Sequence, residues 1–156
     1  MADAARVLVE TFGPKGLTFG TAESLTGGMI AAKVASVSGA SAVLMGGVVA
    51  YDPRVKHEVL GVEQAVIDAV GVVSRECAMQ MALGARRVLG VDVAVSATGI
   101  AGPTGGTPET PVGTVFIGCA DATGVRVDEC HFTGDRQSVR EQSVEYALQM
   151  ALRMLV

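Results

Sequence analysis

Ser24 and Lys56 are the residues whose chemical type and position best fit a reaction centre. Ser24 lies between an apolar segment and a run of small residues, where its hydroxyl can meet both a base and backbone N–H donors. A serine is activated by an adjacent base, and a neutral lysine can serve if its surroundings lower its pKa from about 10.4. The pattern indicates a serine nucleophile. The alternative, given equal weight, is that Ser24 or Thr26 only caps the following helix.

Lysine is the candidate base because neither of the two histidines lies in a motif typical of a Ser-His-Asp triad. Of the three lysines, Lys15 precedes the strand that leads to Ser24 and so lies at the wrong end of it. Helical spacing places Lys33 on the outer face of the predicted helix at residues 26–37. Lys56 remains, in a turn that also holds Tyr51, although a solvated helix lysine is the simpler interpretation.

A glycine-rich run and an arginine supply groups that could bind an anion. Residues 99–106 match neither a Walker A loop nor a dinucleotide fingerprint, because Pro103 and then a strand follow. The backbone N–H groups of such a run can bind one phosphate, and a flexible connection is the alternative. Arg136 begins the last helix, where it is either a second anion-binding group or an ordinary surface arginine.

Apolar periodicity arranges these segments around one sheet. It predicts strands at residues 17–22, 45–50, 93–98, 113–120 and 125–132. It predicts helices at residues 2–12, 26–37, 74–89 and 136–155, and short helical pieces interrupted at Gly61 within residues 52–70. We therefore expect one α/β domain over residues 1–156. No helix separates the third and fourth strands, so the fourth should run antiparallel and a hairpin should return the fifth.

The predicted sheet is mixed and mostly parallel, with helices on both faces. Open α/β sheets bind ligands outside the carboxyl ends of their strands. The segments that hold Ser24, Lys56, the glycine-rich run and Arg136 all follow such ends. We therefore expect them to form a polar pocket at one edge.

Composition excludes several classes of protein. The 156 residues are 49% hydrophobic with 20 further glycines and a net charge of −4, which is incompatible with disorder. No basic cluster indicates nucleic-acid binding, residues 42–51 are too short to span a bilayer, and no signal peptide is visible. We expect a cytoplasmic protein with no nucleic-acid or membrane partner.

Cysteine, histidine and methionine patterns favour packing over metal chemistry. Cys77, Cys119 and Cys130 lack metal-ligand spacing and fit reduced core thiols better than disulfides. The final helix has apolar residues on more than one side. This width indicates a second buried face, and contact with another subunit would cover it, so we expect a homo-oligomer.

Four motifs carry a family resemblance: TAESLTGG (21–28), YDPRVK (51–56), SATGIAGPTGGTPETPVGTV (96–115) and FTGDR (132–136). In order and spacing, over essentially the whole chain, they resemble the CinA C-terminal domain family, the nicotinamide-nucleotide amidases. The resemblance implies hydrolysis of nicotinamide mononucleotide to nicotinate mononucleotide and ammonia in pyridine-nucleotide salvage. It also implies a three-layer α/β/α fold similar to anticodon-binding domains, an oligomer, and no metal or organic cofactor.

The resemblance assigns catalytic roles to three residues. Ser24 matches the family's nucleophile, and Lys56 and Tyr51 match the lysine and tyrosine of its second motif. Backbone N–H groups near Thr26 to Gly28 would stabilise the oxyanion, and Lys56 or Tyr51 would protonate the departing ammonia. The expected substrate-binding residues are Thr26, Gly27, Gly28, Thr98, Gly99, Ile100, Ala101, Gly102 and Arg136.

The chain departs from the family pattern at Leu25, where cysteine is frequent, which should affect packing more than chemistry. Some members carry an N-terminal domain related to molybdopterin-binding proteins. We expect the amidase domain alone here, so no DNA-uptake role is transferred. Two other functions stay open: a serine amidase of different substrate, and a non-catalytic nucleotide-binding module.

Overall fold

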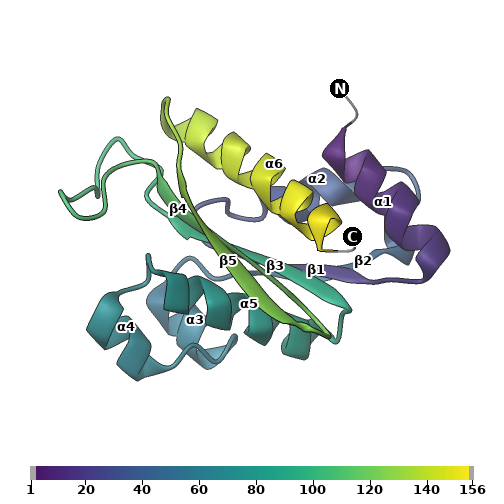
Figure 1. Cartoon of the computed structure of the whole chain (residues 1–156), viewed down its shortest axis with the longest axis horizontal. Helices are drawn as coiled ribbons and strands as arrows, with labels where there is room; N and C mark the ends of the chain where they lie inside the picture. The colour runs from purple at the N-terminus through teal and green to yellow at the C-terminus, as the bar shows by residue number, and fades with distance from the viewer. Residues whose placement is uncertain (1–2, 155–156) are drawn as a thin grey trace.

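A computed structural model describes residues 3–154, in which five strands form one sheet in the order β2-β1-β3-β4-β5 (Figure 1). The strands are β1 Phe19–Glu23, β2 Leu44–Val49, β3 Val93–Gly99, β4 Thr114–Asp121 and β5 Gly124–His131. β1 pairs in parallel with both β2 and β3, whereas β4 is antiparallel to both β3 and β5. The predicted mixed sheet is confirmed, with only β4 reversed.

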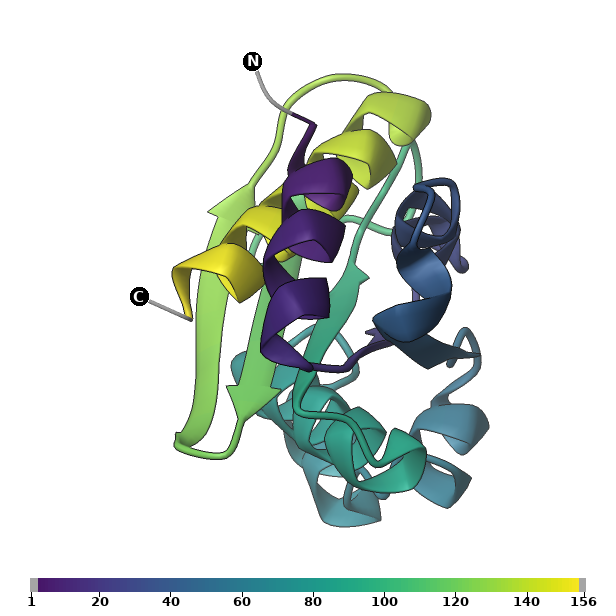
Figure 2. The same ribbon diagram turned by 90° about the vertical axis from the view of Figure 1, so that its right-hand side faces the viewer.

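Helices cover both faces of the sheet, as predicted for a three-layer α/β/α fold. On one face lie α1 Ala4–Lys15, α2 Met29–Ala35 and α6 Arg136–Arg153, and on the other lie α3 Pro53–Glu58, α4 Gln64–Val70 and α5 Arg75–Leu89 (Figures 1 and 2). A short 3₁₀ turn, Ala40–Ala42, precedes β2. Because helices cover both faces, β1 is buried along its whole length.

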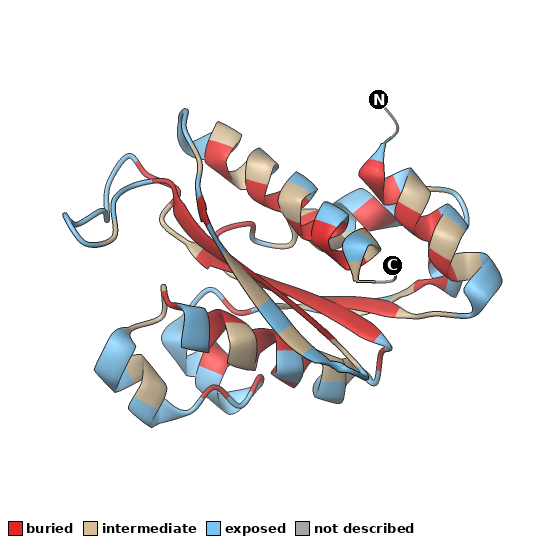
Figure 3. Cartoon of the chain, viewed as in Figure 1, coloured by how far each residue is buried: buried red, intermediate tan, exposed pale blue. Residues whose placement is uncertain are grey.

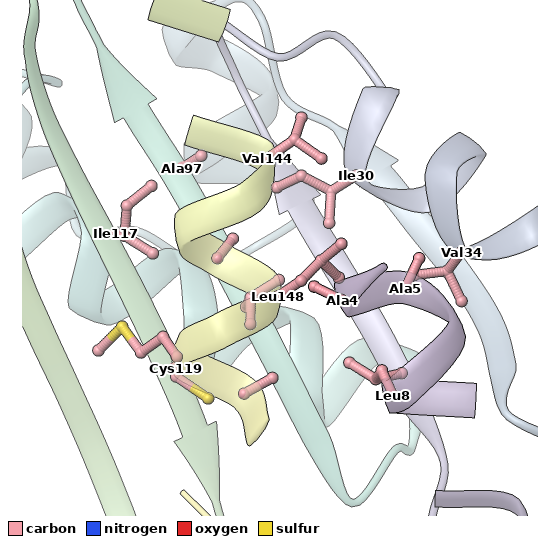
Figure 4. Packing of buried hydrophobic residues seen from close by; sticks show 14 of the residues in the cluster. Ala4, Ala5, Leu8, Ile30, Val34, Ala97, Ile117, Cys119, Val144 and Leu148 are labelled. Carbon is pink, nitrogen blue, oxygen red and sulfur yellow. The ribbon is translucent and has the colours of Figure 1, made fainter. Parts of the chain in front are cut away.

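The core is aliphatic and lies in two layers, one on each side of the sheet (Figure 3). In the first layer α1, α2 and α6 pack against the sheet through small and branched side chains (Figure 4). Examples are Leu8, Ile30, Val34, Ile117, Val144 and Leu148. The second layer packs α5 against the opposite face. All three cysteines are free and buried, which confirms their predicted place in the core.

Capping residues fix the ends of the longest helices where the sequence predicted them. The hydroxyl of Ser74 accepts from the Cys77 N–H at 3.1 Å at the start of α5, and Gly90 ends that helix at a φ of 62°. The Asp135 carboxylate accepts from the Ser138 N–H at 2.8 Å at the start of α6. α6 therefore begins at Arg136, which places that side chain at the edge of the sheet.

Several predicted boundaries are wrong, by one residue at β2, β3, β4 and β5 and by more at the first helix, the second helix and the start of β1. The first helix continues through Gly13-Pro14 and ends at Gly16, whose left-handed φ of 68° and N–H bonds to Phe12 and Gly13 close it. β1 extends one residue further than predicted and includes Glu23. The helix predicted at 26–37 shortens to Met29–Ala35, because a turn precedes it. Leu155, in the predicted last helix, lies outside the described residues.

The broad apolar surface of α6 is covered within the chain. α6 contacts β3 and β4 on the side of the sheet, and it also contacts α1 and α2, which contact each other (Figure 2). The width that suggested a subunit contact is therefore explained by intramolecular packing. The homo-oligomer stays a prediction.

Within residues 3–154, no cluster of three His, Cys, Asp or Glu side chains is arranged to hold a metal ion. No helix in the same part of the chain combines the length and apolar composition needed to cross a membrane.

Candidate active site

Ser24 is the first residue after β1, at the carboxyl end of a central strand. Its N–H donates to Ala97 of β3 at 3.0 Å, and its carbonyl accepts from the Gly27 N–H at 3.0 Å. The chain therefore turns sharply after Ser24. Gly27 and Gly28 have φ values of 58° and 105°, in the region that favours glycine. We call residues 24–28 the nucleophile turn.

The cap of α2 is neither Ser24 nor Thr26, so the capping alternative is wrong. Gly28 occupies the N-cap position. The carboxylate of Glu23, which is 1% exposed, accepts from the Ile30 and Ala31 N–H groups at 2.8 and 3.0 Å. A carboxylate at a helix N-terminus is favourable for both hydrogen bonding and the helix dipole. Glu23 thus takes the capping role and leaves the Ser24 hydroxyl free.

Lys56 is buried beside Ser24. Asp52 caps the short α3 by accepting from the Arg54 N–H at 2.8 Å, and Lys56 lies one turn further on. Its Nζ lies 3.1 Å from the Ser24 Oγ, 2.7 Å from the Ala50 carbonyl oxygen and 3.3 Å from that of Tyr51. Lys56 is 1% exposed, unlike the exposed Lys15 and Lys33.

Burial favours the neutral form of Lys56, which is the form that a base requires. Desolvation lowers the pKa of Lys56 from its ordinary value, while Cys77 and Asp52 oppose this with smaller effects. A neutral amine keeps two hydrogens and one lone pair. The two hydrogens match the carbonyls of Ala50 and Tyr51, which leaves the lone pair for the Ser24 hydroxyl. The arrangement can therefore accept a proton from Ser24.

Tyr51 and Arg136 connect this pair to the glycine-rich run. Arg136 donates through Nη2 to the Tyr51 hydroxyl at 3.1 Å and through Nη1 to the Gly102 carbonyl at 3.0 Å. Tyr51 is 60% exposed, so its hydroxyl lies at the surface of the site. Ser24, Lys56, Tyr51, Arg136 and Gly102 therefore form one connected group at the carboxyl ends of β1, β2 and β3.

Comparison with known proteins identifies the domain. The CinA C-terminal domain matches residues 1–155. A CinA-like protein of Kosmotoga olearia is 41% identical over 150 residues, 96% of this chain and 36% of that protein. A CinA-like protein of Citrifermentans bemidjiense is 48% identical over 141 residues, 90% of this chain and 34% of that protein. The chain belongs to the CinA C-terminal domain family.

Solved structures agree with this assignment over nearly the whole CinA domain. The competence/damage inducible protein CihA from Agrobacterium tumefaciens superposes with a TM-score of 0.96 at 39% identity, covering 98% of this chain and 94% of that chain. A competence-damaged protein (CinA) superfamily protein from Escherichia coli gives 0.93 at 29% identity, covering 99% and 93%. The chain spans about a third of the length of the curated relatives it matches.

The backbone of the nucleophile turn in this CinA domain offers three free donors. Among the predicted oxyanion donors, the Gly27 N–H is already bonded to the Ser24 carbonyl. In the part of the chain from 3 to 154, the N–H groups of Leu25, Thr26 and Gly28 have no acceptor. The Thr26 hydroxyl is buried and has no hydrogen-bond partner among the described residues, and its role in substrate binding stays a prediction.

Three other predicted substrate-binding residues of the CinA domain make contacts within the fold, and their role in substrate binding stays a prediction. The Thr98 hydroxyl donates to the Val72 carbonyl at 2.7 Å. A Cβ on Gly99 would lie 2.6 Å from the Thr114 carbonyl oxygen, so glycine lets β3 approach β4. The Ile100 N–H donates to the same oxygen of Thr114 at 2.9 Å.

Ala101 and Gly102 remain as backbone donors beside Arg136. Both residues are buried, and no acceptor contacts their N–H groups among the residues described. The segment 103–109 that follows is exposed (Figure 3). A cavity of about 530 Å³ between α2 and α6 includes neither Ser24 nor Lys56, so it is separate from this group.

Sequence reasoning overlooked Glu23 and Arg140 of the CinA domain. Glu23 directly follows a buried apolar strand and precedes a turn and a helix, which is a position suited to a helix-capping carboxylate. Arg140 donates to the Leu25 carbonyl at 2.9 Å. Arg140 lies four residues after Arg136, so helical spacing alone places both on the same face of α6.

Proposed function

We propose that this domain hydrolyses the carboxamide of nicotinamide mononucleotide to nicotinate mononucleotide and ammonia, as part of pyridine-nucleotide salvage. The observation that carries the proposal is the 3.1 Å approach of the Lys56 Nζ to the Ser24 Oγ, with Lys56 buried and its pKa lowered. A nucleophile within hydrogen-bond reach of a neutral base is the basic requirement for acyl transfer.

In the first half-reaction, Ser24 becomes acylated. Its oxygen forms a bond to the carboxamide carbon while its proton moves to the Lys56 amine. The carbonyl oxygen becomes an oxyanion, for which the free N–H groups of Leu25, Thr26 and Gly28 are the available donors. The C–N bond then breaks, and the leaving NH₂ group takes the proton from Lys56, directly or relayed by Tyr51, to depart as ammonia. Lys56 is then neutral again.

In the second half-reaction, water replaces ammonia. Lys56, neutral again, accepts a proton from the water as its oxygen bonds to the acyl carbon. The ester bond to Ser24 breaks as Lys56 returns this proton to the Ser24 oxygen. The carboxylic acid loses its own proton to solvent and leaves as its carboxylate. The same base therefore serves both halves, which needs no group beyond those in contact with Ser24.

The nucleotide phosphate has a suitable partner in Arg136. Its guanidinium bonds only neutral oxygens, from Tyr51 and Gly102, and no carboxylate pairs with it among residues 3–154. Guanidinium groups bind phosphate strongly and with defined geometry. The free N–H groups of Ala101 and Gly102 lie in the loop that Arg136 contacts. Phosphate would bind at this side of the site.

The test measures ammonia and carboxylate products from nicotinamide mononucleotide, its riboside and free nicotinamide. We expect turnover of the mononucleotide and a marked rise in KM when the phosphate is missing. Faster turnover of a different amide would replace the proposed substrate. Saturable binding of the mononucleotide with no ammonia release would instead identify a non-catalytic nucleotide-binding module.

A further inference from the structure

Arg140 lies against the nucleophile turn although it belongs to α6, more than a hundred residues later. Its Nε donates to the Leu25 carbonyl at 2.9 Å, and its Nη2 lies 3.4 Å from the Thr26 carbonyl oxygen. Its Nη1 donates to the Gln137 side chain at 2.9 Å. Within residues 3–154 no carboxylate lies at ion-pair distance from Arg140. The positive charge therefore acts on the peptide groups of the turn.

The contact to Leu25 determines where the next N–H points. In a trans peptide the carbonyl and the N–H of the same unit point in opposite directions. Because Arg140 holds the Leu25 carbonyl, the Thr26 N–H points away from Arg140. That N–H is one of the three donors of the turn without an acceptor in the described residues, beside those of Leu25 and Gly28. A cation on the carbonyl side also polarises the peptide and makes its N–H a stronger donor.

The surroundings of the Arg140 guanidinium show which peptide group depends on it. A Cβ on Gly27 would lie 3.6 Å from the Arg140 Nη2, in ordinary contact, and the φ of 58° at Gly27 favours glycine. The Met29 N–H donates to the Thr26 carbonyl at 2.9 Å, so that oxygen has a backbone partner besides Arg140. The Leu25 carbonyl has Arg140 as its partner. Removing Arg140 would therefore release the Leu25–Thr26 peptide first.

We propose that Arg140 is a positioning residue for acyl transfer: it orients and polarises the Leu25–Thr26 peptide so that the Thr26 N–H stabilises the oxyanion formed by Ser24. This inference rests on the proposed function. It assigns different tasks to two arginines one turn apart on α6: Arg136 holds the substrate phosphate, and Arg140 acts on the transition state.

The test compares Arg140→Gln and Arg140→Lys with Arg136→Gln, using nicotinamide mononucleotide. Removing one oxyanion donor costs about 10²–10³ in kcat, and disturbing its orientation should cost about tenfold to hundredfold. We expect Arg140→Gln to lower kcat by this factor with KM nearly unchanged, and Arg140→Lys to recover part of the loss. Arg136→Gln should instead raise KM. A purely structural Arg140 would not separate kcat from KM in this way.

Two results would overturn the proposal: an unchanged kcat in Arg140→Gln, or a loss of kcat explained by an equal loss of folded protein in thermal melts. A second measurement separates this failure from failure of the proposed function. Covalent labelling of Ser24 by a fluorophosphonate also builds charge on an oxygen and needs no nucleotide. We expect Arg140→Gln to label more slowly than wild type even if no ammonia is released. Equal labelling rates, or a wild-type Ser24 that resists the probe, would contradict the positioning role.

Discussion

The Lys56 Nζ lies 3.1 Å from the Ser24 Oγ, although 32 residues separate the two in sequence. Parallel pairing of β1 with β2 explains the approach. Glu23 pairs with Val49 at the last position of the two strands, and the Ala50 N–H still donates to the Glu23 carbonyl at 2.7 Å. Both chains therefore leave the sheet side by side, one toward Ser24 and the other toward Lys56.

Replacing Lys56 should abolish catalysis whether or not the charge is kept. We expect Lys56→Met and Lys56→Arg both to lower kcat by about 10²–10⁴, because methionine has no basic group and arginine stays protonated. Ammonia release measures the effect. Lys33→Met, at an exposed lysine of α2, is the matched control and should retain wild-type activity. Activity in Lys56→Arg close to wild type would exclude lysine as the base.

The rate should depend on the protonation of Lys56. Burial lowers the pKa of Lys56 from its ordinary value of 10.5, so kcat/KM should rise with pH through the lowered value and then level off. Stability follows the same group. Between the folded pKa and 10.5 the unfolded chain binds more protons than the folded chain, so Lys56 makes stability rise with pH in that window.

Comparison with Lys56→Met isolates this dependence. The difference in unfolding free energy between wild type and Lys56→Met should shift in favour of wild type as pH rises through the window. Urea titrations at several pH values measure it. A difference that stays constant with pH, together with a flat rate profile, would show that Lys56 is charged in the folded protein throughout.

Removing the charge of Glu23 should destabilise the nucleophile turn. Its carboxylate accepts from the Thr21 hydroxyl and from two N–H groups of α2. Hydrogen bonds to charged groups contribute about 1.5–3 kcal/mol, so Glu23→Gln should lower the unfolding free energy by about that amount. Glu63 is the N-cap residue of α4 and its side chain makes no capping bond, so Glu63→Gln is the control, expected within about 0.5 kcal/mol of wild type. Equal effects of the two substitutions would refute the capping role.

Thr26→Val should stabilise the protein. The Thr26 hydroxyl is buried without a hydrogen-bond partner, a situation that costs about 1–3 kcal/mol. Valine has nearly the same shape, so we expect the unfolding free energy to rise by about 1 kcal/mol. Thr26→Ser keeps the hydroxyl and loses the methyl group, and should instead destabilise by about 1 kcal/mol. Denaturant titration distinguishes them, and a less stable Thr26→Val would reveal a bound partner for the hydroxyl.

The fold was predictable where local signals and packing agreed. Ser74 and Gly90 mark both ends of α5, and the structure has them as cap residues. The end of α1 was misplaced, because Gly13 stays helical and Gly16 provides the left-handed residue. The surroundings of α6 were not predictable either. Apolar width shows that a helix is covered on several sides, but not whether α1 or another subunit covers it.

The sequence predicted which segments form the candidate site, but not which contacts each side chain makes there. Ligands bind at the carboxyl ends of parallel strands, and this rule was sufficient to predict that Lys56 lies close to Ser24. Glycine-rich runs suggest bound phosphate, yet Gly99 permits close strand packing and Thr98 bonds to Val72. Arg140 was missed because its partners in the nucleophile turn are backbone carbonyls, and a backbone contact cannot be recognised from residue types.

Ammonia release by Ser24→Ala at saturating nicotinamide mononucleotide tests the central claim most directly. Alanine removes the oxygen that forms the acyl bond and leaves the backbone of the nucleophile turn intact. We predict a fall in kcat of about a thousandfold or more, as expected when a covalent nucleophile is lost. A Ser24→Ala variant that releases ammonia at a rate near that of wild type would contradict the account.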